Sequence, residues 1–128
     1  MKLEIKSFAD SGDLEKERLV LRATADGDIG SFIVLRSQSA DDGVSPISGT
    51  KNAYWLPDRT VKSGDLIVVY TKAGKSSRKQ LKTGATAHFF YWGLKLDIWG
   101  SSRKNVAVIL DARDWTSAAP PSKNVEAQ

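Results

Sequence analysis

The chain has 128 residues, enough for one domain with its own core, and 41% of them are hydrophobic, which excludes a disordered protein. It contains no cysteine, so disulfides, thiolate metal sites and cysteine nucleophiles are excluded. Its charge of +4 is uneven, because residues 1–58 hold 7 Lys/Arg against 10 Asp/Glu, whereas residues 59–128 hold 12 against 5. One interpretation is a dipolar molecule that binds an acidic partner with its positively charged second half. The other is a solvated surface on which the uneven distribution of charge has no function.

Residues 2–6 alternate charged and apolar side chains and lack the continuous apolar run of a secretory signal. No later segment is apolar over the length that a membrane-spanning helix needs. The sequence therefore predicts a cytoplasmic protein that does not insert into membranes.

Short apolar runs, separated by Gly, Pro, Asp and Ser, indicate β-strands along the whole chain. Residues 66–70, Leu-Ile-Val-Val-Tyr, form the most β-prone run and are predicted to lie at the centre of a sheet. In chain order, strands are predicted over residues 2–8, 17–24, 29–36, 52–56, 66–70, 86–92 and 105–111. About seven short strands without an amphipathic helix predict an all-β sandwich with sequential antiparallel pairing.

The connections carry the usual turn residues. Asp26-Gly27 is typical of a tight hairpin turn and separates the second and third strands. Residues 37–53 are predicted to form a surface loop with a short edge strand over residues 44–47, and residues 72–84 a second long loop. An irregular segment over residues 93–102 is predicted to be anchored by buried Leu94, Leu96, Ile98 and Trp99.

The segment from Tyr54 to Thr71 dominates the local β signal. Trp55 and Leu56 are predicted to enter the core, and Pro57 is predicted to shape the turn that follows them. The chain is predicted to form a single domain over residues 1–115, followed by a flexible C-terminal tail over residues 116–128 that is small, polar and contains Pro.

Several segments, taken in order, resemble the lamin tail domain, the immunoglobulin-like module of nuclear lamins that also occurs in bacterial proteins. Phe32 stands where the family usually has Trp, the loop over residues 72–84 is long and basic, and the closing turn around residues 111–114 is short. The resemblance covers roughly residues 15–115 and rests on the segments at residues 17–22, 28–35, 54–57, 63–70, 98–100 and 106–111.

The resemblance implies an immunoglobulin-like antiparallel β-sandwich of about seven to eight strands. It also implies a module used for binding, to a protein, a nucleic acid or a membrane-associated assembly, with no enzymatic activity and no cofactor.

No catalytic or metal-binding pattern stands out. His88 is the only histidine and lies in an aromatic strand, so a structural role is favoured over a catalytic one. The tripeptide Gly74-Lys75-Ser76 lacks the upstream glycine spacing of a phosphate-binding loop. The Asp and Glu residues show no spacing that indicates a catalytic acid and base pair. No catalytic residues and no metal ligands are therefore predicted.

The best candidate site is the basic loop, because clustered cations on a loop attract phosphates and other anions. The alternative is a solvated loop whose lysines prevent edge-to-edge aggregation. The candidate residues are Lys72, Lys75, Arg78, Lys79 and Lys82. Aromatic side chains that would stack on bases if exposed, but more often belong to a core, are Tyr54, Trp55, Phe90, Trp92 and Trp99.

Two functional hypotheses follow from these features. The first is a non-enzymatic interaction module that binds a protein partner through its loops or a sheet edge. The second is a nucleic-acid-binding protein that uses the basic loop at residues 72–82. The sequence alone gives neither the partner nor the oligomeric state.

Overall fold

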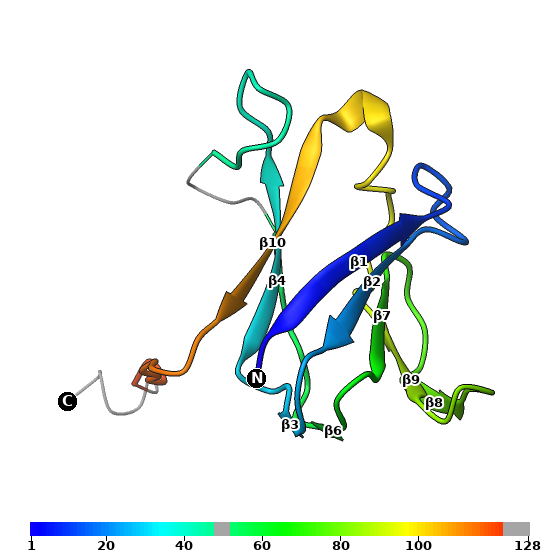
Figure 1. Cartoon of the computed structure of the whole chain (residues 1–128). Helices are drawn as coiled ribbons and strands as arrows, with labels where there is room; N and C mark the ends of the chain where they lie inside the picture. The colour runs from blue at the N-terminus through cyan, green and yellow to red at the C-terminus, as the bar shows by residue number, and fades with distance from the viewer. Residues whose placement is uncertain (48–51, 122–128) are drawn as a thin grey trace.

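Strands account for all the long secondary-structure elements of the computed structural model, which describes residues 1–47 and 52–121 (Figure 1). The strands are β1 (Leu3–Ala9), β2 (Arg18–Ala23), β3 (Gly27–Asp28), β4 (Phe32–Gln38), β5 (Asn52–Trp55), β6 (Thr60–Val61), β7 (Leu66–Tyr70), β8 (Ser77–Gln80), β9 (Thr86–Tyr91) and β10 (Asn105–Asp111). A single 3₁₀ turn, η1 (Ser101–Arg103), precedes β10. The prediction of an all-β protein is confirmed, with eight strands of four or more residues and two strands of two residues within the described chain.

The strands form two layers and a small bridging pair. One layer is a five-stranded sheet in the order β1-β2-β7-β9-β8, and the other is a three-stranded sheet in the order β10-β4-β5. The short strands β3 and β6 pair with each other where the chain passes between the layers. The five-stranded sheet places β7 in its middle, which confirms the central position predicted for residues 66–70.

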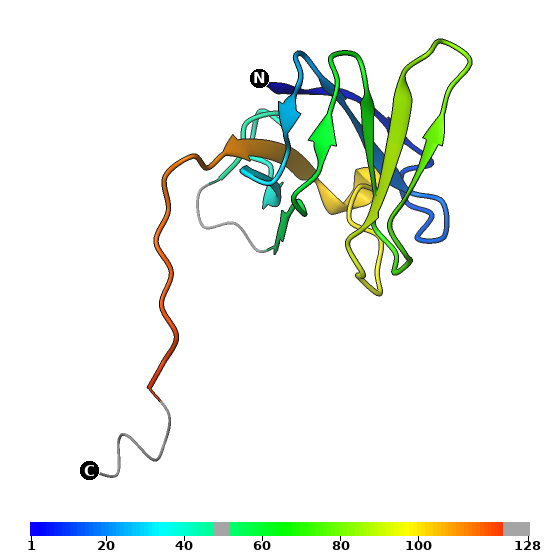
Figure 2. The ribbon, with the colours of Figure 1, turned by 90° about the horizontal axis from the view of Figure 1, so that it is seen from below.

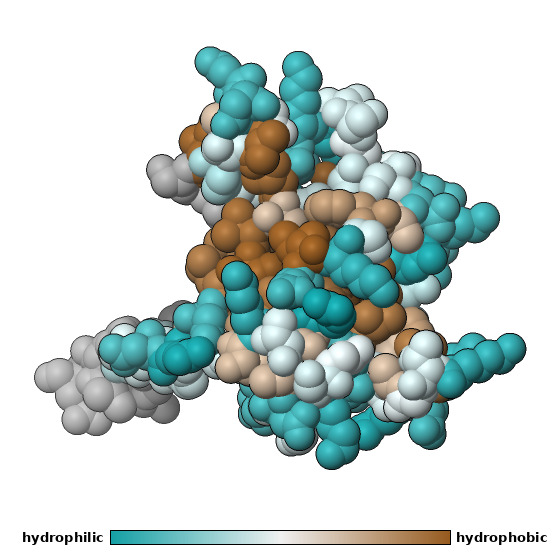
Figure 3. Space-filling view, viewed as in Figure 1, coloured by the Kyte–Doolittle hydropathy of each residue, from teal (hydrophilic) through white to brown (hydrophobic). Residues whose placement is uncertain are grey.

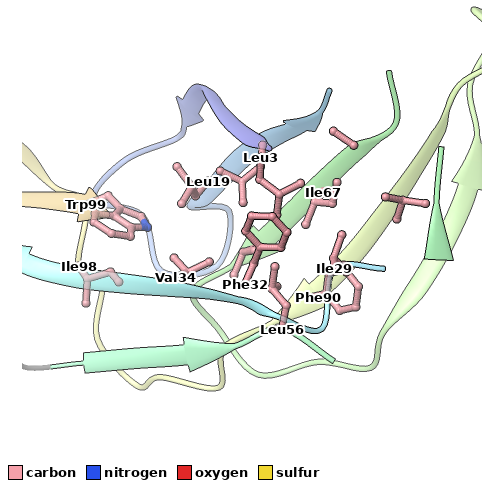
Figure 4. Close-up of a cluster of buried hydrophobic side chains, with 14 residues drawn as sticks. Leu3, Leu19, Ile29, Phe32, Val34, Leu56, Ile67, Phe90, Ile98 and Trp99 are labelled. Atoms are coloured by element: carbon pink, nitrogen blue, oxygen red, sulfur yellow. The ribbon is translucent and has the colours of Figure 1, made fainter. Parts of the chain in front are cut away.

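The core lies between the two layers (Figure 4). Alternation along β7 points Ile67 and Val69 inward, and Phe90 of β9 joins them from the neighbouring strand. Phe32 and Val34 of β4 meet these side chains from the opposite sheet. This face-to-face packing of apolar side chains is the defining feature of a β-sandwich.

One strand pair departs from the predicted antiparallel order, because β7 and β9 run parallel, with Ile67 opposite His88. After β7 the chain forms β8 at the edge of the sheet and leaves room for one strand between them. β9 then fills this place between β7 and β8. The expected continuous loop over residues 72–84 is therefore interrupted by β8, which pairs antiparallel with β9.

The prediction of a hairpin turn at Asp26-Gly27 is wrong. Gly27 pairs with Val61 and Asp28 pairs with Thr60, so this segment carries the chain from one layer to the other. A tight hairpin would have kept β2 and β4 in one sheet. The edge strand predicted over residues 44–47 is reduced to an isolated bridge between Ser39 and Pro46.

Two side chains predicted to be buried are exposed. Trp55 is 48% exposed, because pairing with β4 places it opposite Ile33 on the outer face and turns Tyr54 inward. Leu96 is 66% exposed, whereas Ile98 is buried as predicted.

After β10 the chain leaves the body as an extended segment without regular structure, as Figure 2 shows for residues 112–121. The amide of Ala112 donates to the Ser31 carbonyl, and the Trp115 ring packs edge-on against Trp55 at 4.9 Å between centroids.

Candidate binding surface

The candidate cations gather around β8, at one edge of the five-stranded sheet. Four of the five predicted side chains are exposed, two within the strand and one on either side of it. These four are Lys75, Arg78, Lys79 and Lys82. None of them forms an ion pair with any residue that the structure describes. The edge therefore carries uncompensated positive charge.

Lys72 does not belong to this edge. Its Nζ lies 3.9 Å from a carboxylate oxygen of Glu15 and 5.5 Å from the centre of the Tyr70 ring. Its charge is thus partly neutralised, and the structure separates Lys72 from the other four predicted residues.

The register of β8 divides its two cations between opposite faces. Arg78 lies opposite His88, a residue of the inward face, and Lys79 lies opposite Ala87. Because neighbouring residues of a strand point to opposite faces, the two positive charges flank the free backbone edge of β8. An edge strand presents unpaired amide and carbonyl groups that pair readily with another extended chain.

Arg59 adds a cation that sequence reasoning missed. Its guanidinium lies 4.7 Å from the centre of the Phe90 ring and donates a 3.2 Å hydrogen bond to the carbonyl of Ser77 in β8. Burial, followed by the positive charge of Arg78, lowers the pKa of Arg59. No local signal marks Arg59, because it reaches β8 only through the fold.

The aromatic side chains of the outer face of this sheet are already in contact with other groups. Tyr70 stacks on Tyr91 with 5.0 Å between ring centroids, and the Arg18 guanidinium lies 5.8 Å from the Tyr70 ring. The backbone of Gly74 covers Tyr91, since a Cβ built on Gly74 would lie 2.4 Å from that ring. A base has no free face of this stack on which to lie.

The aromatic residues that the sequence offered for base stacking do not form a platform. Phe90 and Trp99 are buried, and Tyr54 stacks on Trp92 with 5.8 Å between centroids. Only Trp55 is exposed, and it lies in the other sheet.

His88 is buried, and its Nε2 lies 3.0 Å from Oδ2 of Asp65. Burial by itself raises the pKa of Asp65, but hydrogen bonds from the amides of Thr86 and Lys62 and from His88 outweigh it and hold the pKa below its usual value. This pair ties the turn before β7 to β9, which agrees with the structural role predicted for His88. Nothing in the sequence pattern indicates its partner, because Asp65 and His88 are 23 residues apart in the sequence.

A cleft of about 820 Å³ opens beside β4 and contains Arg36. The guanidinium of Arg36 donates to Oδ1 of Asn52 at 2.6 Å and to Oδ1 of Asn105 at 3.4 Å. The carboxylate that lines the cleft is Asp97, and two hydrogen bonds from Arg103 lower its pKa. A carboxylate with a lowered pKa is a weak base, so the cleft gives no support for acid and base chemistry.

The segment Gly74-Lys75-Ser76 runs into strand β8 rather than into a helix, which agrees with its exclusion as a phosphate-binding loop. Within residues 1–47 and 52–121, no three His, Cys, Asp or Glu side chains come together as metal ligands. No helix in this part of the chain is long and apolar enough to cross a membrane.

Comparison with known proteins does not extend these observations. No protein-family model matches the chain, and no curated protein matches it at a significant level. The resemblance to the lamin tail domain stays a prediction from the sequence.

Proposed function

We propose that the chain is a non-enzymatic interaction module that binds an acidic, extended segment of a protein partner along the free edge of β8. The observation that carries the proposal is the combination of an exposed edge strand with Arg78 and Lys79 on its two faces. Backbone pairing would supply affinity, and the two cations would select carboxylates on neighbouring side chains of the bound segment, which point to opposite faces.

The surrounding charges support an acidic partner. Lys75 and Lys82 extend the positive surface beyond both ends of β8, and Arg59 adds a cation on the inner face. Positive edges repel one another, so the same residues discourage self-association through β8. The resemblance to the lamin tail domain supports the same kind of use, as a binding module without a cofactor.

The second candidate function is nucleic-acid binding through the same cations. Its support is the net charge of the edge alone, since the aromatic stack beside it has no free face. Such binding would depend on phosphate contacts and would weaken steeply with salt.

A binding experiment separates these candidates. The probes are a fluorescent peptide of repeated Val-Val-Glu-Glu, which presents carboxylates on both faces of a strand, the same peptide with prolines that block strand pairing, and a labelled oligothymidine. We expect the first peptide to bind at low salt and the proline peptide to bind at least about tenfold more weakly, because proline removes ladder hydrogen bonds.

Charge reversal provides the matched variants. Arg78→Glu with Lys79→Glu should reduce binding of the acidic peptide by about tenfold or more, as expected for two lost charge contacts. Lys95→Glu, an exposed lysine outside β8, is the control and should leave binding nearly unchanged. Failure of the acidic peptide to bind at low salt contradicts the proposal, and salt-sensitive binding of oligothymidine alone favours the second candidate.

A further inference from the structure

The outer face of the three-stranded sheet is apolar. Strand register aligns Leu110, Ile33 and Trp55 in one row across the sheet, and Val108 and Leu35 in the next. Leu110 and Trp55 are 42% and 48% exposed, and the other three are half-buried. Figure 3, which views this sheet from its β10 edge, shows apolar side chains over β10 and β4. This apolar face adjoins β10, the edge strand of the sheet.

The edge of this sheet at β10 is also unprotected. β10 is the terminal strand, and β1 of the other layer approaches it without pairing with it. Its seven residues, Asn-Val-Ala-Val-Ile-Leu-Asp, contain no Lys, Arg, Pro or Gly and show no bulge against β4. Long, regular edges without lysine, proline or a bulge are the ones that pair with other chains.

The other edges carry the protection that β10 lacks. β8 has Arg78 and Lys79, and β1 is interrupted by a register shift between Ile5 and Ser7. β5 is only four residues long, and the C-terminal segment crosses toward it, because Trp115 packs on a side chain of β5. The C-terminal segment therefore turns away from the free edge of β10.

We propose that two copies of this chain associate through antiparallel pairing of β10 with β10 about a two-fold axis at Val108. Each residue i of one strand then lies opposite residue 216 − i of the other, as follows from the axis position. Val108 faces Val108, Val106 faces Leu110, and Ala107 faces Ile109. The two three-stranded sheets become one six-stranded sheet with a continuous apolar outer face.

The residue pattern selects a second copy as the occupant. In this register all five apolar residues of β10 face apolar residues, and the polar ends, Asn105 and Asp111, face each other. A shift of two residues in one direction would place Leu110 opposite Lys104, and a shift in the other direction would place Ala107 opposite Asp111. The strand is thus self-complementary in one register, as a two-fold interface requires.

Because the chain has no cysteine, single cysteines report this register directly. Val108→Cys places two thiols opposite each other at the axis, so mild oxidation should give a covalent dimer. Val106→Cys is the matched control, since its two copies lie about 13 Å apart in this register. An equimolar mixture of the Val106→Cys and Leu110→Cys variants should give the mixed dimer. Equal cross-linking of Val108→Cys and Val106→Cys, or none with Val108→Cys, overturns the proposal.

Sedimentation equilibrium tests the association itself. The unmodified chain should sediment as a dimer across the micromolar range, and Val108→Lys should sediment as a monomer because two lysines meet at the axis. Val44→Lys, on an exposed loop, is the control and should remain dimeric. A monomer for the unmodified chain at every concentration, or an unchanged dimer for Val108→Lys, overturns the proposal.

Discussion

Glu17 shows how a single buried charge can be accommodated at the residue scale. Its side chain is fully buried, and Oε1 accepts hydrogen bonds from the amides of Gly12 at 2.8 Å and Trp99 at 3.1 Å. Oε2 accepts from Oγ1 of Thr71 at 2.5 Å and from the amide of Ile98 at 2.9 Å. Four donors satisfy the carboxylate, which therefore links the start of β2, the end of β7 and the segment before η1.

Replacement of Glu17 by Gln should be costly, because the amide group turns a donor toward amides that need an acceptor. We expect Glu17→Gln to lower the free energy of unfolding by about 3 kcal/mol, measured by urea denaturation. Glu4→Gln is the matched control, since Glu4 is exposed and paired with Arg22 at 2.9 Å; its effect should stay below about 1 kcal/mol. Equal effects of the two substitutions would contradict the role assigned to Glu17.

At the scale of the strands, the connection from β7 to β8 determines where the basic edge begins. The segment after β7 must pass over the end of β9 before it forms β8, and Gly74 makes this passage against the face of Tyr91. Tyr91 in turn stacks on Tyr70, the last residue of β7. The crossover is thus packed on aromatic rings, which fixes the start of the basic edge.

Adding a methyl group at Gly74 should disturb this packing. A Cβ would lie 2.4 Å from the Tyr91 ring, closer than real contacts allow, so either the Tyr91 ring or the backbone at Gly74 must shift. We expect Gly74→Ala to reduce the free energy of unfolding by about 1–3 kcal/mol in urea denaturation. In Gly27→Ala, the control, a Cβ would meet only the flexible side chain of Met1, and the loss should be smaller. A larger loss for Gly27→Ala would show that the crossover does not depend on this contact.

At the scale of the whole molecule, buried polar pairs connect strands that are distant in the sequence. Asp65, just before β7, accepts hydrogen bonds from the amide of Thr86 at 3.0 Å and from the amide of Lys62 at 3.0 Å, and it contacts His88 of β9. These contacts hold two central strands of the five-stranded sheet in their parallel register. They also make the stability of the whole fold depend on the charge of Asp65.

The lowered pKa of Asp65 gives this dependence a sign. In the unfolded chain the Asp65 carboxyl has a pKa of about 3.9. At a pH between its pKa in the folded chain and its pKa in the unfolded chain, the unfolded chain binds more protons than the folded chain. The free energy of unfolding therefore rises with pH in this range. The contribution is complete above about pH 4 and is lost as pH falls through the folded value. Asp65→Asn should therefore be less stable at neutral pH and should lose less stability on acidification. Urea denaturation between neutral and acidic pH measures both effects, and parallel pH profiles for the two proteins would contradict this assignment.

The sequence determined the class of the fold and much of its core. The apolar run at residues 66–70 formed the central strand, in which Ile67, Val68 and Val69 are all buried. Such a pattern is local, because a central strand that is covered on both faces requires a continuous apolar run within one short segment. The basic residues around β8 were visible for a similar reason, since their clustering lies within one short segment.

Only the tertiary structure decided which strands are neighbours and what each site residue meets. The parallel pairing of β7 with β9, the approach of Arg59 to Ser77 and the contact of His88 with Asp65 join residues from different segments. Trp55 points outward because β5 pairs with β4, which no pattern within residues 52–56 specifies. Strand pairing depends on contacts between distant parts of the chain, whereas the pattern of apolar residues that predicts a strand lies within that strand.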